Sequence, residues 1–214
     1  MSEAVYTIAL REPQLLHIDC GTALSCGANQ RWYPYWRARL SGCGPTAAAN
    51  LLWYLAASRP HRCGTLFAGD ARKQAEMVRL MRQVWRYVRP APWGMARGQS
   101  FACGARRYAA AHGVPLQAEL LQVPAAGTRR PSAAQLYDFL AKALAADLPV
   151  AFLNRSNGAV RNLPGWHWVT LVAVQPDLQA VMYDGSDSHI VDLALWLTST
   201  QKGGAFVVLQ PTDD

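Results

Sequence analysis

Residues 41–55 read Ser41-Gly-Cys-Gly-Pro-Thr-Ala-Ala-Ala-Asn-Leu-Leu-Trp-Tyr-Leu55. A glycine-rich turn is followed here by residues that favour a helix, which we expect to run to about Ser58 and to stop before Pro60. Pro45 suits the first turn of that helix, because its missing N–H would have no intrahelical acceptor there. The sequence therefore predicts that Cys43 lies at a helix N-terminus.

Cys43 has the predicted surroundings of a reactive thiol. The partial positive charge of a helix N-terminus stabilises the thiolate, which is the nucleophilic form of cysteine. The N–H of Cys43 would point toward a developing oxyanion, and Gly42 and Gly44 would let a substrate carbonyl approach the sulfur closely. A structural cysteine in a tight turn is the alternative interpretation. We take Cys43 as the candidate nucleophile.

The rest of the chain predicts helices first and strands last. We expect a second helix that starts at Asp70 as its N-cap and is ended by Pro90 and Pro92, and a third that is followed by Gly113. The predicted elements after the first helix are helices over 70–88, 99–112 and 132–146 and strands over 116–123, 150–154, 166–174, 180–184, 189–191 and 205–209. This segregation predicts an α+β fold in which a helical half, with the nucleophile helix, packs on a C-terminal antiparallel sheet.

The chain of 214 residues is predicted to form a single domain. Within it we expect an arm at 1–40 that packs over the core, a mainly helical half at 41–147 and a sheet half at 148–210. No stretch approaches the roughly 20 consecutive apolar residues of a membrane helix. Met1–Arg11 lacks the pattern of a secretory signal. The sequence therefore predicts a cytoplasmic protein that does not associate with membranes.

The formal net charge of +7 raises the question of a nucleic-acid partner. Most of the positive charge is arginine, and its densest run, 72–89, also carries apolar residues at helical spacing. The solvated face of an amphipathic helix is the favoured interpretation of that run. We therefore expect no nucleic-acid partner.

The cysteines of the chain form no Cys-x-x-Cys pair. Neither a metal site nor a cofactor is predicted. An odd number of cysteines in a chain without an export signal indicates reduced thiols, and we expect all but Cys43 to fill the core. The five cysteines are Cys20, Cys26, Cys43, Cys63 and Cys103.

His167 is the candidate general base. It follows Pro164-Gly165 at the start of an apolar strand, and strand alternation would place its imidazole on the face opposite Trp166 and Trp168. The other histidines stand in loops, near helix ends or in a polar hairpin, where an ordinary structural hydrogen bond is the commoner role. They are His17, His61, His112 and His189, of which His189 is the nearest competitor.

Asp184 is the candidate third residue. It ends the predicted strand Val181-Met-Tyr-Asp184 and follows His167 by 184 − 167 = 17 residues, which suits two adjacent antiparallel strands and their turn. A carboxylate there would hold the imidazole in one tautomer and stabilise its charged form. Asp187 is the alternative acceptor, but it belongs to a polar turn that we expect to face water.

These motifs carry a family resemblance. Gly42-Cys-Gly-Pro-Thr-Ala-Ala-Ala49 with its helix, the later His167-Trp-Val169 strand and the Asp184 strand together resemble the papain-like cysteine peptidase superfamily. Over about residues 30–209 the chain is most similar to the bacterial peptidase-like group related to double-glycine leader peptidases. The resemblance implies a papain-like fold, a cleft between the helical and sheet halves, and acyl transfer by Cys43, His167 and Asp184 without a metal.

The chain departs from that family at the second oxyanion donor. The family usually has a glutamine about six residues before the cysteine, as a donor to the oxyanion, whereas this chain has Arg37 there. The nearest upstream glutamine is Gln30, at 43 − 30 = 13 residues. A longer loop over 32–40 would return its side chain to the same place. We therefore predict Gln30 as an oxyanion donor.

These residues together predict a cysteine-nucleophile hydrolase, either a peptidase or an amidase. Cys43 would attack a peptide or other amide-containing substrate and form a covalent acyl-enzyme. An acyltransferase would use the same site. A catalytically inactive peptide-binding module would keep only the cleft.

Overall fold

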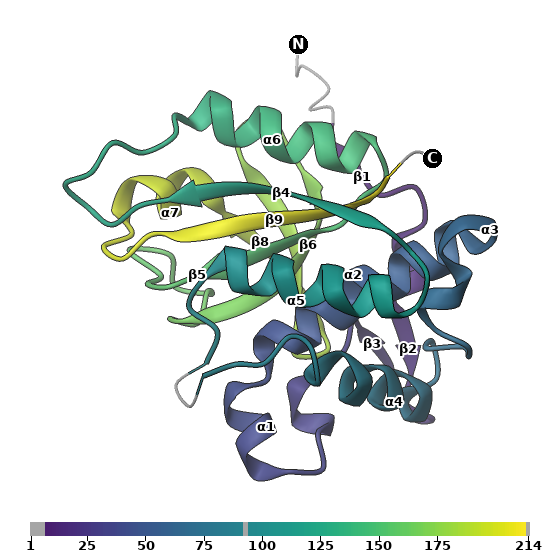
Figure 1. Ribbon diagram of the computed structural model, residues 1–214. Helices are drawn as coiled ribbons and strands as arrows, with labels where there is room; N and C mark the ends of the chain where they lie inside the picture. The colour runs from purple at the N-terminus through teal and green to yellow at the C-terminus, as the bar shows by residue number, and fades with distance from the viewer. Residues whose placement is uncertain (1–6, 92–93, 213–214) are drawn as a thin grey trace.

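The computed structural model describes residues 7–91 and 94–212. Residues 1–6 of the N-terminal stretch and the predicted helix terminator Pro92 lie outside these ranges. Within them a seven-stranded sheet forms the middle layer, with helices on both of its faces (Figure 1). The fold is mixed α+β, as the sequence predicts.

The main sheet is antiparallel and has the strand order β4-β9-β5-β6-β7-β8. Strand β1 also pairs with β6, beyond the end of β5, and β2 and β3 form a separate hairpin. The strands are Ile8–Ala9 (β1), His17–Asp19 (β2), Leu24–Cys26 (β3), Leu116–Val123 (β4), Val150–Asn154 (β5), His167–Val174 (β6), Gln179–Asp184 (β7), Asp187–Asp192 (β8) and Gly204–Pro211 (β9).

The helices divide between the two faces of this sheet. In Figure 1, α6 lies above the sheet, where it packs on β1, β5 and β6, while α2 and α5 lie below it. The α-helices are Trp36–Ser41 (α1), Cys43–Ser58 (α2), Pro60–Cys63 (α3), Gln74–Trp85 (α4), Gly98–Ala111 (α5), Ala133–Ala145 (α6) and Leu193–Ser199 (α7). Short 3-10 helices are Pro13–Leu16 (η1), Gln30–Trp32 (η2) and Gly64–Leu66 (η3).

Helix α2 lies at the centre of the core. Every residue from Cys43 to Ala56 is buried, since β5 and β6 cover one side of the helix and α4 and α5 cover others. A helix that is apolar all round is stable only in such a position. Ala47, Ala48 and Ala49 let these neighbours approach the helix closely, because their side chains are small.

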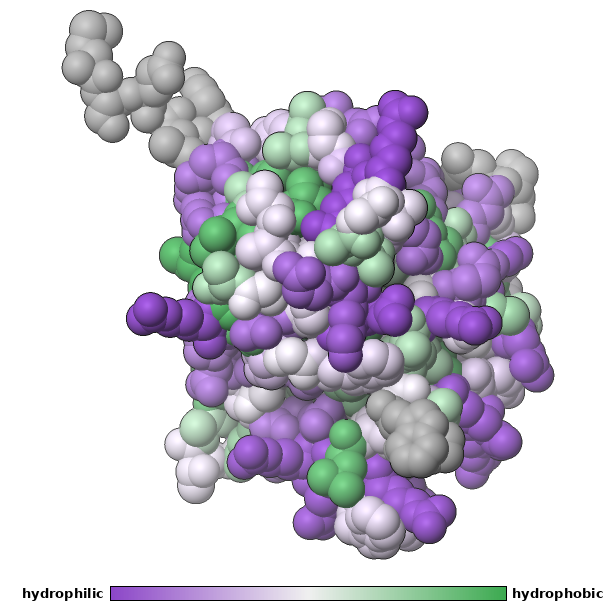
Figure 2. Space-filling view, turned by 90° about the vertical axis from the view of Figure 1, so that its left-hand side faces the viewer, coloured by the Kyte–Doolittle hydropathy of each residue, from purple (hydrophilic) through white to green (hydrophobic). Residues whose placement is uncertain are grey.

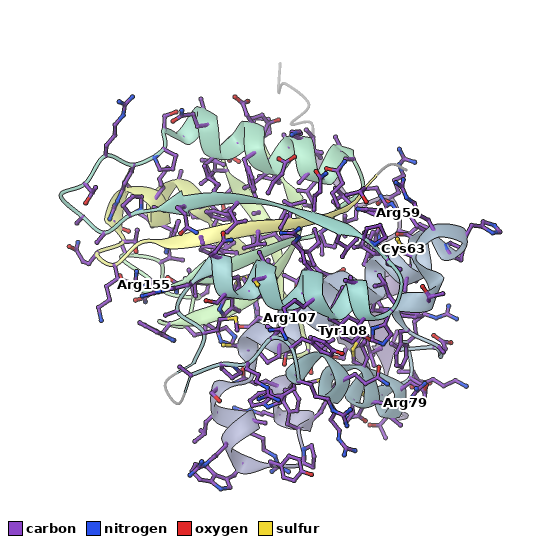
Figure 3. All side chains as sticks on the ribbon, viewed as in Figure 1. Arg59, Cys63, Arg79, Arg107, Tyr108 and Arg155 are labelled. Atoms are coloured by element: carbon purple, nitrogen blue, oxygen red, sulfur yellow. The ribbon has the colours of Figure 1, made fainter. Side chains whose placement is uncertain are left out.

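Tyr108 joins the helices that surround α2. Its hydroxyl donates a hydrogen bond to the carbonyl of Leu66 at 2.7 Å, and it lies 3.2 Å from Oε1 of Gln83 in α4. Its ring also meets that of Tyr87 edge to face, with centroids 5.6 Å apart. Figure 3 shows Tyr108 between α5 and α4. The helical layer is thus held by polar contacts as well as by apolar packing.

Several predicted elements are confirmed to the residue. Strands β4 and β5 have the predicted bounds, and α2 ends at Ser58. Ser132 precedes α6 and forms a capping box with Gln135: its hydroxyl accepts from the Gln135 N–H at 3.1 Å, and the Gln135 side chain accepts from the Ser132 N–H at 2.8 Å. Gly113 follows α5 with a φ of +75°, as expected of a glycine after a helix.

Several predicted boundaries differ from the structure, and the contacts explain two of them. The helix expected from Asp70 starts at Gln74 with Lys73 as its N-cap, because the Asp70 carboxylate instead accepts hydrogen bonds from the backbone and guanidinium of Arg72. The strand expected from Trp166 starts at His167, since Trp166 has a φ of +57° and cannot continue an extended strand.

The predicted separation into a helical half and a sheet half is incomplete. Strand β1 comes from the expected arm and β4 from the expected helical half, yet both join the main sheet. The short helices α1 and α7 were not predicted. No helix within the described ranges is both long and apolar enough to cross a membrane.

We expect Asn50→Ala to lower the free energy of unfolding by about 2–3 kcal/mol. Asn50 in α2 accepts a hydrogen bond from the Ala28 N–H at 2.9 Å and donates one to Oγ1 of Thr170 at 3.0 Å, and all three residues are buried. The substitution leaves both partners unsatisfied. Urea denaturation measures the change, with Asn157→Ala as the control because that side chain donates only to the nearby Val160 carbonyl. Equal losses in both variants would contradict this role of Asn50.

Candidate functional site

A cleft lies where the N-terminus of α2 meets the ends of β6 and β7. The four residues that the sequence predicts for the site, Gln30, Cys43, His167 and Asp184, all line it. They come from three separate parts of the chain: η2, the start of α2, and the hairpin of β6 and β7. The fold therefore brings the predicted residues together.

Cys43 is the first residue of α2 and is 6% exposed. The N–H groups of a first helical turn have no intrahelical acceptor, so they and the helix dipole favour negative charge at this position. Pro45 occupies the same first turn, as predicted. Cys43 therefore lies at a helix N-terminus, as the sequence predicts.

Gly42 is required by packing, and Gly44 is closely packed. A Cβ on Gly42 would collide with the Ala38 carbonyl oxygen and would lie 2.8 Å from the Tyr33 ring. A Cβ on Gly44 would lie 3.2 Å from Cβ of Met95. Neither glycine is among the described residues that line the cleft. Their small size thus fixes the start of α2 between its neighbours, rather than leaving space for a substrate as the sequence suggested.

His167 and Asp184 are joined by a hydrogen bond. Nε2 of His167 lies 2.6 Å from Oδ1 of Asp184, and the side chains are 16% and 18% exposed. His167 begins β6 and Asp184 ends β7, where Thr170 opposite Tyr183 sets the register of the two strands. The predicted contact across 17 residues is present.

His167 also interacts with Cys43, which contributes to the raised pKa of the imidazole and lines the same cleft. Because Nε2 faces Asp184, Nδ1 is the ring nitrogen left for the sulfur. Burial alone would lower the pKa of His167, but the hydrogen bonds and negative charges of Asp184 and Cys43 more than offset burial and raise the pKa to about 10. The arrangement therefore favours the charged form of the His167 imidazole.

Asp187 is not part of the hydrogen-bonded pair of His167 and Asp184. It pairs with Asp184 across the hairpin as the first residue of β8, and it is exposed, as predicted. Burial and the charge of Asp187 raise the pKa of the Cys26 thiol, which places its carboxylate on the side of β3. Asp184 is the carboxylate that contacts His167.

Gln30 reaches the cleft through a short helix rather than a loop. Its Nε2 donates a hydrogen bond to the Arg39 carbonyl in α1 at 3.0 Å, while its Oε1 is buried without a hydrogen-bond partner among the described residues. An amide nitrogen carries two hydrogens, so one N–H of Gln30 remains for a ligand in the cleft. Arg37, at the position of the family glutamine, is exposed in α1 and lies against the Trp36 ring.

Asn29 is a positioning residue that the sequence did not reveal. Its Nδ2 donates to the Gly185 carbonyl at 2.6 Å and to Oγ of Ser186 at 2.9 Å, in the turn that follows Asp184. Its Oδ1 accepts from the Arg31 N–H at 2.9 Å and caps η2, which begins with Gln30. One side chain therefore fixes both Gln30 and the turn beside Asp184. Asn before a short helix is a cap signal, but no local pattern predicts its contact with a distant turn.

The remaining histidines do not enter the cleft. His17 is hydrogen-bonded to the Tyr183 hydroxyl at 3.3 Å, and His112 to the Tyr108 carbonyl at 2.8 Å. His61 and His189 are exposed. The expected structural hydrogen bond is thus confirmed for His17 and His112.

All five cysteines are free thiols. Cys63 is buried, as expected of a cysteine that fills the core. Cys20 and Cys26 are only partly buried and Cys103 is exposed, so the prediction that all of them fill the core is wrong. Among residues 7–91 and 94–212, no cluster of His, Cys, Asp and Glu side chains has the arrangement of a metal site.

Comparison with protein-family models and with curated proteins gives no relatives for this chain. No model of a protein family matches it, and no curated protein matches its sequence significantly.

We expect Asn29→Ser to lower the pKa of His167. Serine retains an oxygen that can cap η2, but it is too short to hold the turn after Asp184, so the carboxylate is less firmly placed against the imidazole. The imidazole proton resonances followed by NMR across pH measure this pKa. Asn162→Ser is the matched control, because Asn162 holds the same hairpin at the Ile190 carbonyl, away from Asp184. An unchanged titration of His167 in Asn29→Ser would contradict the positioning role.

Proposed function

We propose that this chain is a papain-like cysteine hydrolase that acts on peptide or other amide bonds through a covalent acyl-enzyme. One observation carries the proposal: His167 contacts Asp184 through Nε2 and lines the same cleft as Cys43, which begins a helix and contributes to the raised pKa of His167. A nucleophile, a base and a residue that orients the base are the minimum set for this chemistry.

The proposed reaction has two halves. The Cys43 sulfur attacks the substrate carbonyl, the S–C bond forms and the carbonyl oxygen becomes an oxyanion. His167 then donates its Nδ1 proton to the leaving amine as the C–N bond breaks, which leaves an acyl thioester. In the second half, neutral His167 takes a proton from water, water attacks the thioester, and the acid product leaves as Cys43 and His167 regain their starting state.

Asp184 and Gln30 assist this reaction without covalent change. The carboxylate keeps the Nε2 proton of His167 in place and stabilises the imidazolium. The N–H of Cys43 and the remaining N–H of Gln30 are the proposed donors to the oxyanion. An acyltransferase would follow the same first half and pass the acyl group to an amine, so partition of the acyl-enzyme between water and added hydroxylamine separates the two functions.

We expect iodoacetamide to alkylate Cys43 well below the pH of about 8.5 at which a free cysteine ionises. Cys103 is the internal control, because it is exposed but not part of the site. Asp184→Ala should slow the reaction of Cys43 in acid. The raised pKa of His167 depends partly on Asp184, so without this carboxylate a smaller fraction of His167 is charged and the thiolate is stabilised less. Peptide mass mapping after short exposures measures each thiol.

The matched variant is Asp187→Ala, which removes the exposed carboxylate of the same turn. It should leave the alkylation profile of Cys43 nearly unchanged. A shift in Asp187→Ala but not in Asp184→Ala would reassign the third residue. Slow alkylation of Cys43 at all pH values would remove it as the nucleophile, and with it the proposed enzyme.

We expect Gln30→Ala to slow acylation of Cys43 by about 10- to 1,000-fold, the scale of losing one oxyanion donor. A 4-nitrophenyl ester serves as a simple acyl donor, and both released nitrophenol and the mass of the acylated protein report the reaction. Gln30→Glu is the conservative control, because it keeps the shape of the side chain but has no N–H to donate. Normal acylation of both variants, with the fold intact, would show that Gln30 is not a donor.

A further inference from the structure

Acidic residues are unevenly distributed along this chain. Residues 20–69 contain five arginines and residues 77–118 contain seven, and neither segment contains an aspartate or glutamate. These segments supply α1, α2, α3, α5 and most of α4. In Figure 1 these helices lie below the sheet. The helical side of the molecule therefore carries positive charge with little internal neutralisation.

A groove lies between α1 and α4 on this side. Its floor is formed by Tyr33, Ala38 and Trp85, and the rings of Tyr33 and Trp85 meet edge to face with centroids 5.2 Å apart. Arg37, Arg82 and Arg86 also line it. Figure 2 shows mostly hydrophilic and pale side chains at the lower end of one face of the molecule, with a small hydrophobic spot among them.

The arginines of this groove differ from their neighbours in the same basic run. Arg72 is paired with Asp70 and Arg79 with Glu76. Within the described residues, no carboxylate lies within salt-bridge distance of the three arginines that line the groove, Arg37, Arg82 and Arg86. A solvated helix face accounts for the paired arginines, while the groove arginines surround an aromatic floor and have no anionic partner.

The groove adjoins the cleft of Cys43. Tyr33 in the groove floor packs against Gly42, which directly precedes Cys43, and Gln30 in the cleft is hydrogen-bonded to the Arg39 carbonyl of α1. Tyr35 and Trp36 continue the aromatic surface along α1, and both are more than half exposed. The segment from Gln30 to Ala38 thus contributes to both the cleft and the groove.

We propose that the groove between α1 and α4 binds an acidic segment of the peptide substrate. The proposal rests on the hydrolase function proposed above and names the substrate class of that site. Glutamate or aspartate side chains form bidentate pairs with guanidinium groups, and an apolar side chain between them covers the aromatic floor. A nucleic acid would also neutralise arginines, but the connection to a cleft that acts on acyl groups favours a peptide.

Fluorescence anisotropy with a labelled synthetic peptide rich in glutamate and leucine tests the groove. The peptide should bind the wild-type protein, with an affinity that falls as salt rises, and an otherwise identical peptide with glutamine for glutamate should bind far more weakly. Arg82→Glu combined with Arg86→Glu should weaken binding by roughly tenfold or more. Arg129→Glu, an exposed arginine in the loop before α6, is the matched control and should have little effect.

The alkylation rate of Cys43 in the same variants separates this proposal from the proposed function. It should not change when the groove arginines are replaced. Equal binding by the double variant and by wild type, or equal loss in the Arg129→Glu control, would overturn the groove as the site while leaving Cys43 chemistry intact. Tighter binding of a single-stranded oligouridine than of the acidic peptide, lost in the same double variant, would overturn the choice of a peptide.

Discussion

The N-terminus of α2 has almost no freedom to move, because the helix is buried from Cys43 to Ala56 and its first turn is closely packed on both sides. Gly42 meets Tyr33 and Ala38, while Gly44 meets Met95. A closely packed interior resists the shift of a whole helix. Packing along the entire helix therefore sets the position of the Cys43 sulfur relative to β6. The position of His167 at the start of β6 sets the imidazole.

The segment that precedes α2 supports both sides of the cleft. Asn29 holds the turn after Asp184 and caps the helix that carries Gln30, while the Cys26 N–H donates to the Ser186 carbonyl at 2.9 Å. Asn50 joins Ala28 in this segment to Thr170 in β6. What the sequence indicates only as an arm over the core is thus a bridge between the central helix and the sheet. The same segment contributes Gln30 to the cleft and Tyr33 to the proposed peptide groove.

Local signals explain which features the sequence could predict. The glycine and proline around Cys43, the capping box at Ser132 and the apolar runs of β5 and β6 each act within a few residues, so their elements are confirmed. The contact of His167 with Asp184 followed from the spacing of two neighbouring strands. Asp70 was misread because its side chain has two uses, as a cap or as a partner of Arg72, and local pattern does not choose between them. Asn29 was missed because its partners lie in a distant turn.

That distance has a consequence for the order in which the protein folds. The hydrogen bond from Asn29 to the Gly185 carbonyl joins residues 156 positions apart. Contacts of such long sequence separation require closure of a large loop and slow the folding reaction. While the chain is being synthesised, α2 emerges well before β6 and β7, so the thiol of Cys43 has neither imidazole nor carboxylate beside it. A newly made chain therefore carries an ordinary cysteine, and the thiol gains its partners only when the β6–β8 hairpins dock against the segment that precedes α2.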